Sequence, residues 1–170
     1  EGKEIELDRA ILDELGDPLV HLLRNAVDHG IEPPAERRKR GKKPEGEIVL
    51  AAVRERAGVA ISISDDGRGI DRAKILAEAR RDGLVDPHVE QLSDDRLLRV
   101  LARPGFSTAE AVTNVSGRGV GIDVAVTRIR ALGGTIDIRS EPGQGTTFVL
   151  RLPVTLAIVR ALIAAVGPER

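Results

Sequence analysis

The amino-acid sequence predicts one α+β domain, a two-layer α/β sandwich whose helices cover one face of a mixed, mostly antiparallel sheet. Three observations predict this fold. The chain has 170 residues, which suits one domain that buries a core without disulfides or a structural metal. Helical patterns, strand-like runs, a further helix and a hairpin follow one another, an order that favours helices on one face. Two Phe, with no Tyr or Trp, leave the core to aliphatic side chains.

Two helices are expected before the first strand. Asp8 is the candidate N-cap of a short helix that ends at Gly16. Asp17, followed by Pro, opens a second helix over residues 18–29. Residues 36–46 combine Arg and Lys with Pro and Gly, which indicates an exposed loop or a short surface helix.

The remaining elements follow from apolar patterning and from turn residues. The expected strands are 47–53, 59–64, 135–140 and 146–152, and the expected helices are 72–81, 94–101 and 121–132. Residues 103–120 show no sustained period and predict an 18-residue loop, a length expected of a functional lid. The apolar residues 156–166 fit a helix or a strand.

Composition excludes several classes of function. The chain has 26 basic and 27 acidic side chains, so its net charge of −1 gives no overall attraction to nucleic acid or to an anionic membrane. It has no Cys, which excludes disulfides and thiolate chemistry and fits a reducing cytoplasm. No apolar run reaches the roughly 18 residues of a membrane span. The basic residues within 37–43 suggest a nucleic-acid patch, but flanking Glu residues and the lack of aromatics favour a solvated loop.

The helix over residues 18–29 carries the first candidate site. Four polar side chains at spacings of four, three and one share a face: His21, Asn25, Asp28 and His29. A solvated face is the plain alternative, but Asn is a poor helix former. The Asn25 carbonyl oxygen suits Mg²⁺, which takes few protein ligands and relies on phosphate oxygens and waters.

Two glycine loops are further candidates. In residues 65–70, DDGRGI, a buried carboxylate can accept a hydrogen bond from the exocyclic amine of adenine, whereas guanine presents an oxygen there. Gly67 and Gly69 let the backbone approach a flat base, although an ordinary acidic turn has the same pattern. Residues 117–121, GRGVG, open a helix whose free N–H groups favour phosphate, with a hinge as the alternative. Neither a Rossmann fingerprint nor a P-loop motif is present.

In this order and spacing the three pieces resemble the nucleotide-binding boxes of the GHKL (HATPase, Bergerat-fold) ATPase superfamily, which includes histidine kinases, Hsp90, gyrase and MutL. Five segments are similar to the CheA family of chemotaxis histidine kinases: 21–30 HLLRNAVDHG, 65–71 DDGRGID, 104–108 PGFST, 116–123 SGRGVGID and 152–158 LPVTLAI. The resemblance covers nearly the whole chain and implies the GHKL type of sandwich, with a flexible ATP lid over residues 103–120.

The resemblance also implies site residues. Asn25 would bind Mg²⁺, with His21 beside the metal or the terminal phosphate, and both would be catalytic. Asp65 would read adenine, supported by Gly69 and, through water, by Thr147. Lys74 and Arg118 would contact phosphates. The implied nucleotide pocket comprises Asn25, Asp28, His29, Asp65, Gly67, Gly69, Ile70, Lys74, Phe106, Ser107, Gly117, Arg118, Gly119, Val120, Gly121 and Thr147, with Phe106 as the anchor of the lid.

By the same resemblance the chain would bind Mg-ATP and supply its γ-phosphate to a His on a separate phosphotransfer domain. Hydrolysing members of the superfamily carry a Glu four residues before the Mg-binding Asn, a position that His21 occupies here, so slow hydrolysis is expected. Two alternatives within the same fold stay open. One is a nucleotide-gated interaction module of the anti-sigma type, and the other is an ATP hydrolase.

The resemblance implies further organisation and partners. Residues 1–153 would form the ATP-binding domain and 154–170 a linker toward a regulatory domain, while the N-terminus begins inside the domain. The implied partners are ATP or ADP, the phosphotransfer domain, a CheW-like adaptor, chemoreceptors and a response regulator, without nucleic acid or membrane insertion. The parent kinase would be cytoplasmic, at membrane-associated receptor arrays.

Overall fold

The computed structural model describes residues 7–106 and 122–154 of the chain. Its elements, in chain order, are α1 Arg9–Asn25, the π-helical turn η1 Ala26–Gly30, α2 Pro34–Lys39, β1 Ile48–Glu55, β2 Gly58–Asp65, α3 Arg72–Arg81, α4 Asp94–Leu101, α5 Ile122–Ala131, β3 Thr135–Glu141 and β4 Gly145–Leu152. The expected strands and the helices after β2 are therefore confirmed to within about two residues at their ends, the accuracy that boundaries allow.

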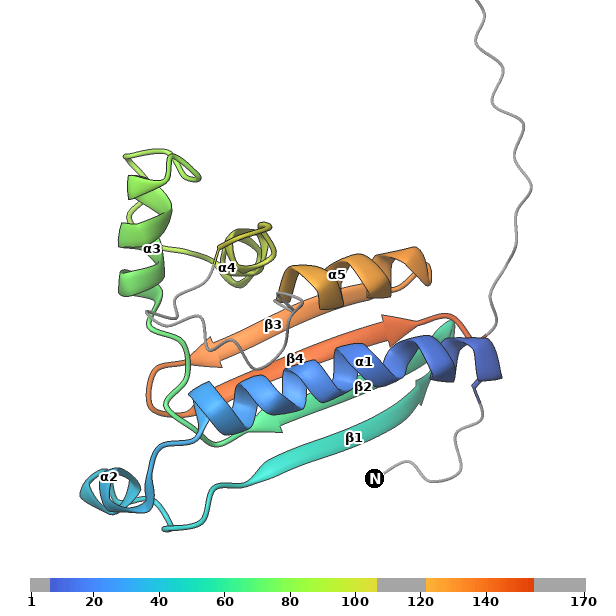
Figure 1. Ribbon diagram of the computed structural model, residues 1–170, viewed down its shortest axis with the longest axis horizontal. Coiled ribbons are helices and arrows are strands. Elements are labelled where there is room, and N and C mark those ends of the chain that lie inside the picture. The colour runs from blue at the N-terminus through green and yellow to red at the C-terminus, as the bar shows by residue number, and fades with distance from the viewer. Residues whose placement is uncertain (1–6, 107–121, 155–170) are drawn as a thin grey trace, which may run out of the picture.

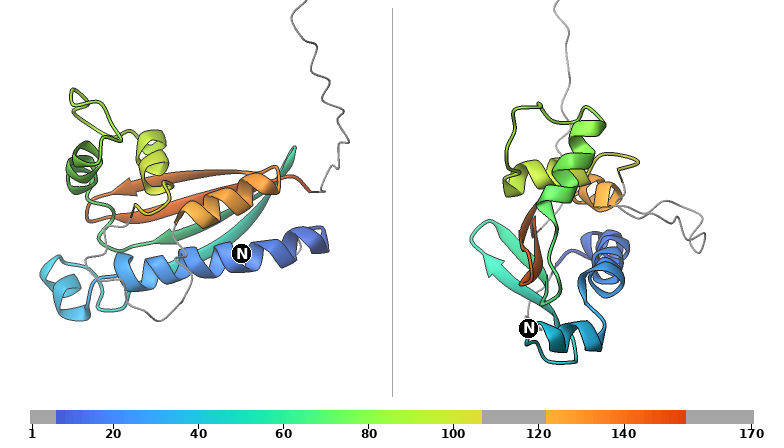
Figure 2. Two further views of the ribbon diagram at one scale, coloured as in Figure 1. Left: turned by 45° about the horizontal axis from the view of Figure 1, so that its top comes forward. Right: turned by 90° about the vertical axis from the view of Figure 1, so that its left-hand side faces the viewer.

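The four strands form one sheet in the order β1-β2-β4-β3, in which each neighbouring pair is antiparallel. Helices α1 and α5 lie side by side on one face of the sheet, and α3 and α4 lie beyond its β3 edge (Figures 1 and 2). The predicted two-layer sandwich is thus confirmed. The parallel pair implied by a mixed sheet is not found within residues 7–106 and 122–154.

Strand alternation decides which side chains face the helices. In β2 the buried residues are Val59, Ile61 and Ile63, and in β4 they are Phe148, Leu150 and Leu152. They pack against aliphatic stripes of α1 and α5 in one core, as the composition predicted. Full burial of each large aliphatic side chain stabilises the fold by about 1.5–3 kcal/mol. Because the side-chain period of a strand is two, Asp65 and Thr146 continue these inward rows at one end of the sheet.

The break expected between Gly16 and Asp17 is wrong. Asp8 does cap the helix, since its Oδ1 accepts a hydrogen bond from the Ala10 amide at 2.9 Å, but α1 then runs on to Asn25 with Pro18 inside it. Its buried residues are Ile11, Leu15, Pro18 and Leu22. Intervals of four, three and four keep them in one stripe on the sheet, and this burial outweighs the backbone hydrogen bond that Pro18 removes.

The last turn of the predicted helix is also different. The α-helical pattern ends at Asn25 and widens into η1, where the Ile31 amide donates to the Ala26 carbonyl at 2.8 Å. The turn brings the Gly30 carbonyl to the loop after β2, where it accepts from the Arg68 amide at 2.8 Å. A contact between distant parts of the chain therefore sets this end of the helix.

The expected basic surface segment does contain a short helix, α2, but one of its arginines is wholly buried: Arg37 has 0% exposure. Of the expected lid, residues 103–106 are described and 107–120 lie outside the described residues, as do 156–166. Among the helices that the structure describes, none has the length and apolar character needed to cross a membrane.

A substitution at Gly16 tests the continuity of α1. An added Cβ would meet nothing within 4 Å, so Gly16→Ala should stabilise the protein by about 0.5–1 kcal/mol in urea unfolding. Gly83 is the matched control, because its surroundings are equally open but its φ is +67°. Gly83→Ala should therefore destabilise by about 1 kcal/mol. A destabilising Gly16→Ala would mean that the helix breaks there.

Candidate functional site

The first two candidate sites of the sequence meet at one end of the sandwich, where β2 ends, β4 begins and η1 contacts both strands (Figure 1). Two sets of contacts show that helices α1 and α5 run antiparallel. Arg128 of α5 pairs with Glu14 at 3.0 Å and with Asp17 at 3.7 Å, whereas Asp123, earlier in α5, acts electrostatically on His21, later in α1. The first turn of α5 therefore lies beside the last turns of α1.

Asp65, the last residue of β2, is half-buried at the centre of this end. Its Oδ1 accepts a hydrogen bond from the Gly67 amide at 2.9 Å. Burial raises the pKa of the Asp65 carboxyl, although the Gly67 and Thr146 amides partly oppose the shift. The carboxylate is thus a desolvated acceptor with one oxygen already oriented by the backbone.

Glycines allow the backbone to close around Asp65. A Cβ on Gly67 would lie 2.1 Å from the Gly30 carbonyl oxygen and 2.8 Å from Asp65 Oδ1. A Cβ on Gly145 would lie 1.9 Å from the Asp65 carbonyl oxygen. Real Cβ atoms do not approach other atoms so closely, so the three chain segments can meet only through glycine.

The glycine loop after Asp65 is fixed from the side of the β3–β4 hairpin. The Ile70 amide donates to Ser140 Oγ at 2.8 Å, and Ser140 Oγ bonds Thr146 Oγ1 at 3.0 Å. Gly69 has φ +69° and lies so close to the Glu141 carbonyl oxygen that a Cβ would be 2.2 Å from it. The predicted loop is therefore held against the hairpin by a hydrogen bond and by close backbone packing.

Thr147 does not support Asp65 in the structure. Asp65 pairs across the sheet with Thr146, whereas Thr147 pairs with Ser64, to whose Oγ its own hydroxyl donates at 3.0 Å. Successive side chains of a strand point to opposite faces, so the Thr147 hydroxyl lies on the face away from the helices. Thr146, with 7% exposure, takes the inward place. Continuing the apolar alternation of 148, 150 and 152 backwards would have identified it.

His21 and Asn25 form a hydrogen-bonded pair one turn apart on α1, with Asn25 Nδ2 at 2.9 Å from His21 Nε2. An amide nitrogen can only donate, so Nε2 accepts and the imidazole is neutral. Burial first, and then the charge of Arg24, lowers the pKa of His21, which agrees with that state. Asn25 keeps its oxygen Oδ1 for another partner, and a hard carbonyl oxygen fits Mg²⁺.

The other expected residues are distributed around this core. Asp28 and His29 are exposed on η1, Lys74 is exposed in the first turn of α3, and Phe106 packs partly buried against the core. Outside the described residues lie Ser107, Gly117, Arg118, Gly119, Val120 and Gly121. The helix α5 that follows them has its N-terminus at the site, where the helix dipole favours an anion.

An ionic cluster around the buried side chains of Arg37 and Glu32 was not predicted from the sequence. The cluster consists of ion pairs among Arg37, Glu32, Lys42 and Asp66. Arg37 Nη2 lies 2.6 Å from Asp66 Oδ2, and Lys42 Nζ lies 3.2 Å from Glu32 Oε1. The sequence gives no sign that Arg37 is buried, because it is one of several basic residues in a row. The apolar pattern that usually indicates burial is missing from residues 36–43.

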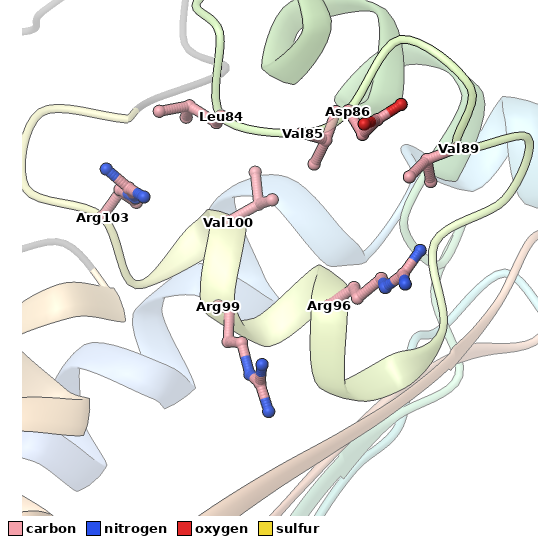
Figure 3. A pocket seen from close by; sticks show the side chains of 8 residues that line it. All are labelled: Leu84, Val85, Asp86, Val89, Arg96, Arg99, Val100 and Arg103. Atoms are coloured by element: carbon pink, nitrogen blue, oxygen red, sulfur yellow. The ribbon is translucent and has the colours of Figure 1, made fainter.

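A cavity of about 300 Å³ lies elsewhere, between α4 and the segment after α3 (Figure 3). Its lining residues are Leu84, Val85, Asp86, Val89, Arg96, Arg99, Val100 and Arg103. None of the expected site residues is among them. The glycine-framed end of the sheet, rather than this cavity, therefore collects the predicted residues.

The chain is similar in sequence to a family of ATPases and to several chemotaxis kinases. A sequence family described as "Histidine kinase-, DNA gyrase B-, and HSP90-like ATPase" matches residues 14–156. Three relatives align over 99% of this chain: Sensor histidine kinase CheAY of Helicobacter pylori at 48% identity, Chemotaxis protein CheA of Bacillus subtilis at 44% and Chemotaxis protein CheA of Halobacterium salinarum at 49%. The chain spans 21%, 25% and 25% of the lengths of these relatives.

The state of His21 can be measured by NMR. We expect its imidazole to titrate below the ordinary value of 6.5, because burial and Arg24 disfavour the charged ring. The unfolded chain then binds this proton more tightly than the folded protein, so stability falls as the pH drops from 6.5 through the folded pKa. Arg24→Gln should raise the pKa of His21. A wild-type pKa at or above 6.5 would contradict the assignment.

Proposed function

The chain belongs to the histidine kinase-, DNA gyrase B- and HSP90-like ATPase family, and on that premise we propose that it is the ATP-binding catalytic domain of a chemotaxis histidine kinase. In this role it binds Mg-ATP and supplies the γ-phosphate to a His on a separate phosphotransfer domain. The observation that carries the proposal is the Asp65 carboxylate, which is half-buried and bordered by glycines at the end of the sheet.

Adenine recognition follows from the chemistry of that carboxylate. The Gly67 amide holds Asp65 Oδ1 at 2.9 Å, and each carboxylate oxygen has two lone pairs, so Oδ2 can accept from the exocyclic amine of adenine. Guanine places a carbonyl oxygen at that position and would be repelled. Gly67, Gly69 and Ile70 supply a surface without bulky side chains for the base, and we assign to Thr146 the supporting role that the resemblance gave to Thr147.

The phosphate end of the nucleotide would extend from Asp65 toward Asn25 and the first turn of α5. Asn25 Oδ1 is the protein oxygen that we assign to Mg²⁺, and His21 holds the Asn25 amide in place through Nε2. Bound Mg²⁺ would neutralise charge on the phosphate oxygens. We propose Lys74, Arg118 and the backbone of Gly117, Gly119 and Gly121 as further phosphate contacts. Ser107 and Val120 would contact the nucleotide from the lid, and Phe106 would anchor the lid.

The hydrogen-bonded pair of His21 and Asn25 on α1 favours transfer of the γ-phosphate over hydrolysis of ATP. A hydrolase needs a general base that takes a proton from water. His21 Nε2 is already bonded to Asn25, so this nitrogen is not free to activate water. Phosphoryl transfer asks mainly for positioning and charge neutralisation, which the arrangement provides.

The larger setting rests on the relatives, two of which are named chemotaxis proteins. We propose that the parent kinase is cytoplasmic, that it works with a CheW-like adaptor, chemoreceptors and a response regulator, and that residues 154–170 lead toward a regulatory domain. Phosphate transfer from ATP to an isolated phosphotransfer domain of a CheA kinase, measured with this chain, tests that setting. No transfer with saturating Mg-ATP would favour the anti-sigma-like alternative.

Removal of the Asp65 carboxylate tests nucleotide recognition. Asp65→Ala deletes a charge-assisted hydrogen bond of roughly 1.5–3 kcal/mol, so Mg-ADP affinity in calorimetry should fall about 10- to 150-fold. GDP should not bind wild-type protein under the same conditions. Asp82→Ala, at the exposed end of α3, is the control and should leave affinity unchanged. A loss below twofold for Asp65→Ala would place the adenine elsewhere.

Thr146 and Thr147 point to opposite faces of the sheet, so substituting each in turn tests which face the nucleotide contacts. Thr146→Val removes the inward hydroxyl, which bonds Ser140, and should weaken ADP binding by about 1 kcal/mol, or roughly fivefold. Thr147→Val is the matched control, because it removes only the bond to Ser64 on the far face and should leave ADP affinity within twofold. The reverse order of effects would contradict the strand register.

A further inference from the structure

We propose that Arg37 is a positioning residue for purine recognition: with Lys42, it orients the peptide unit between Asp66 and Gly67, whose N–H holds the Asp65 carboxylate. This inference rests on the proposed role of Asp65. Figure 1 shows α2, which carries Arg37, at the same end of the sheet as the tip of β2. Toward the site, the hydrogen bonds of Arg37 reach Asp66 rather than Asp65, so Arg37 would act through that peptide.

Every donor of the Arg37 guanidinium has an acceptor. Nε donates to the Lys43 carbonyl at 2.8 Å, and Nη2 donates to the Glu45 carbonyl at 3.2 Å. Nη2 also reaches Asp66 Oδ2 at 2.6 Å. Nη1 donates to Glu32 Oε2 and to the Asp66 carbonyl, each at 3.2 Å. Five donors in a planar fork thus fix the relative positions of three chain segments.

One peptide unit links this cluster to the site. The Asp66 carbonyl accepts from Arg37 Nη1 at 3.2 Å and from Lys42 Nζ at 2.7 Å. The N–H of the same peptide belongs to Gly67 and donates to Asp65 Oδ1 at 2.9 Å. Because a peptide is planar, cations on its oxygen fix the direction of its N–H and also polarise it. Lys42 Nζ further bonds the Gly67 carbonyl at 2.7 Å.

Opposite charges are paired throughout the cluster. Arg37 and Lys42 meet the carboxylates of Glu32 and Asp66, and Arg40 lies 3.9 Å from Glu32 Oε1 at the exposed side. Burial works to raise the pKa of the Glu32 and Asp66 carboxyls, but their hydrogen bonds and the nearby cations outweigh it and lower both pKa values. Both groups are therefore ionised near neutral pH, which keeps the cations in place.

Attachment of α2 alone does not explain an arginine at this position. Arg37 is the buried residue of α2, and an apolar side chain would anchor a short helix without the cost of desolvating ions. The fork instead grips the Asp66 side chain and the Asp66 carbonyl together. Asp66 lies between Asp65, whose carboxylate would read adenine, and Gly67, whose amide holds that carboxylate.

The test compares two ligands that differ only in the group that Asp65 recognises: ADP and the diphosphate of purine riboside, which lacks the exocyclic amine. Arg37→Lys keeps the charge but loses the fork. We expect its ADP affinity to fall about tenfold, the order of a charge-assisted hydrogen bond, while affinity for the analogue stays within twofold. The matched control Arg38→Lys, on the exposed side of α2, should change neither affinity.

Equal loss of affinity for both ligands would show a general structural role and overturn the proposal, as would no loss for either. If Arg37→Lys fails to fold, Lys42→Met provides the same comparison, since it removes one of the two donors to the Asp66 carbonyl. In either folded variant the Gly67 amide of the free protein should exchange with solvent faster. A wild-type protein that does not distinguish ADP from the analogue would refute the role of Asp65 itself, whatever Arg37 does.

Discussion

The Asp65 carboxylate, which accepts a hydrogen bond from the Gly67 amide, lies where three backbone segments meet more closely than any side chain permits. Gly30 from the end of the first helix and Gly67 from the loop after β2 border this carboxylate, and Gly145 from the start of β4 lies against the Asp65 backbone carbonyl. The π-helical turn follows from the same constraint, because it carries the Gly30 carbonyl to the Arg68 amide. Helix end, glycine loop and hairpin are therefore parts of one junction, and the sheet serves to bring them together.

Electrostatics at this junction separates two adjacent carboxylates. Asp65 is held mainly by backbone N–H groups and burial raises its pKa, whereas Asp66 is paired with Arg37 and its pKa is lowered. One carboxylate is thus fixed into the protein by ions, and its neighbour is left as an acceptor for a ligand. Arg37 and Lys42 connect the two through the shared peptide.

The sequence predicted the strands, the later helices and the glycine loop that follows the end of β2 at Asp65, because their signals are local: alternation, caps and glycines beside an acidic strand end. Three features depended on distant contacts instead. Pro18 lies within a helix because its neighbours bury a continuous stripe, and η1 exists because Gly30 meets Arg68. The burial of Arg37 depends on Glu32 and Asp66 together. Thr147, which the resemblance implied beside Asp65, pairs with Ser64 instead, a position that strand alternation predicts.

A crystal structure of the chain with Mg-ADP would show directly whether Asp65 recognises adenine. We expect the exocyclic amine of adenine to lie within hydrogen-bond distance of Asp65 Oδ2, the base to rest against the Gly67–Gly69 backbone, and the phosphates to extend toward Asn25 and the first turn of α5. Adenine bound elsewhere, for example in the cavity beside α4, with no contact to Asp65, would contradict this expectation.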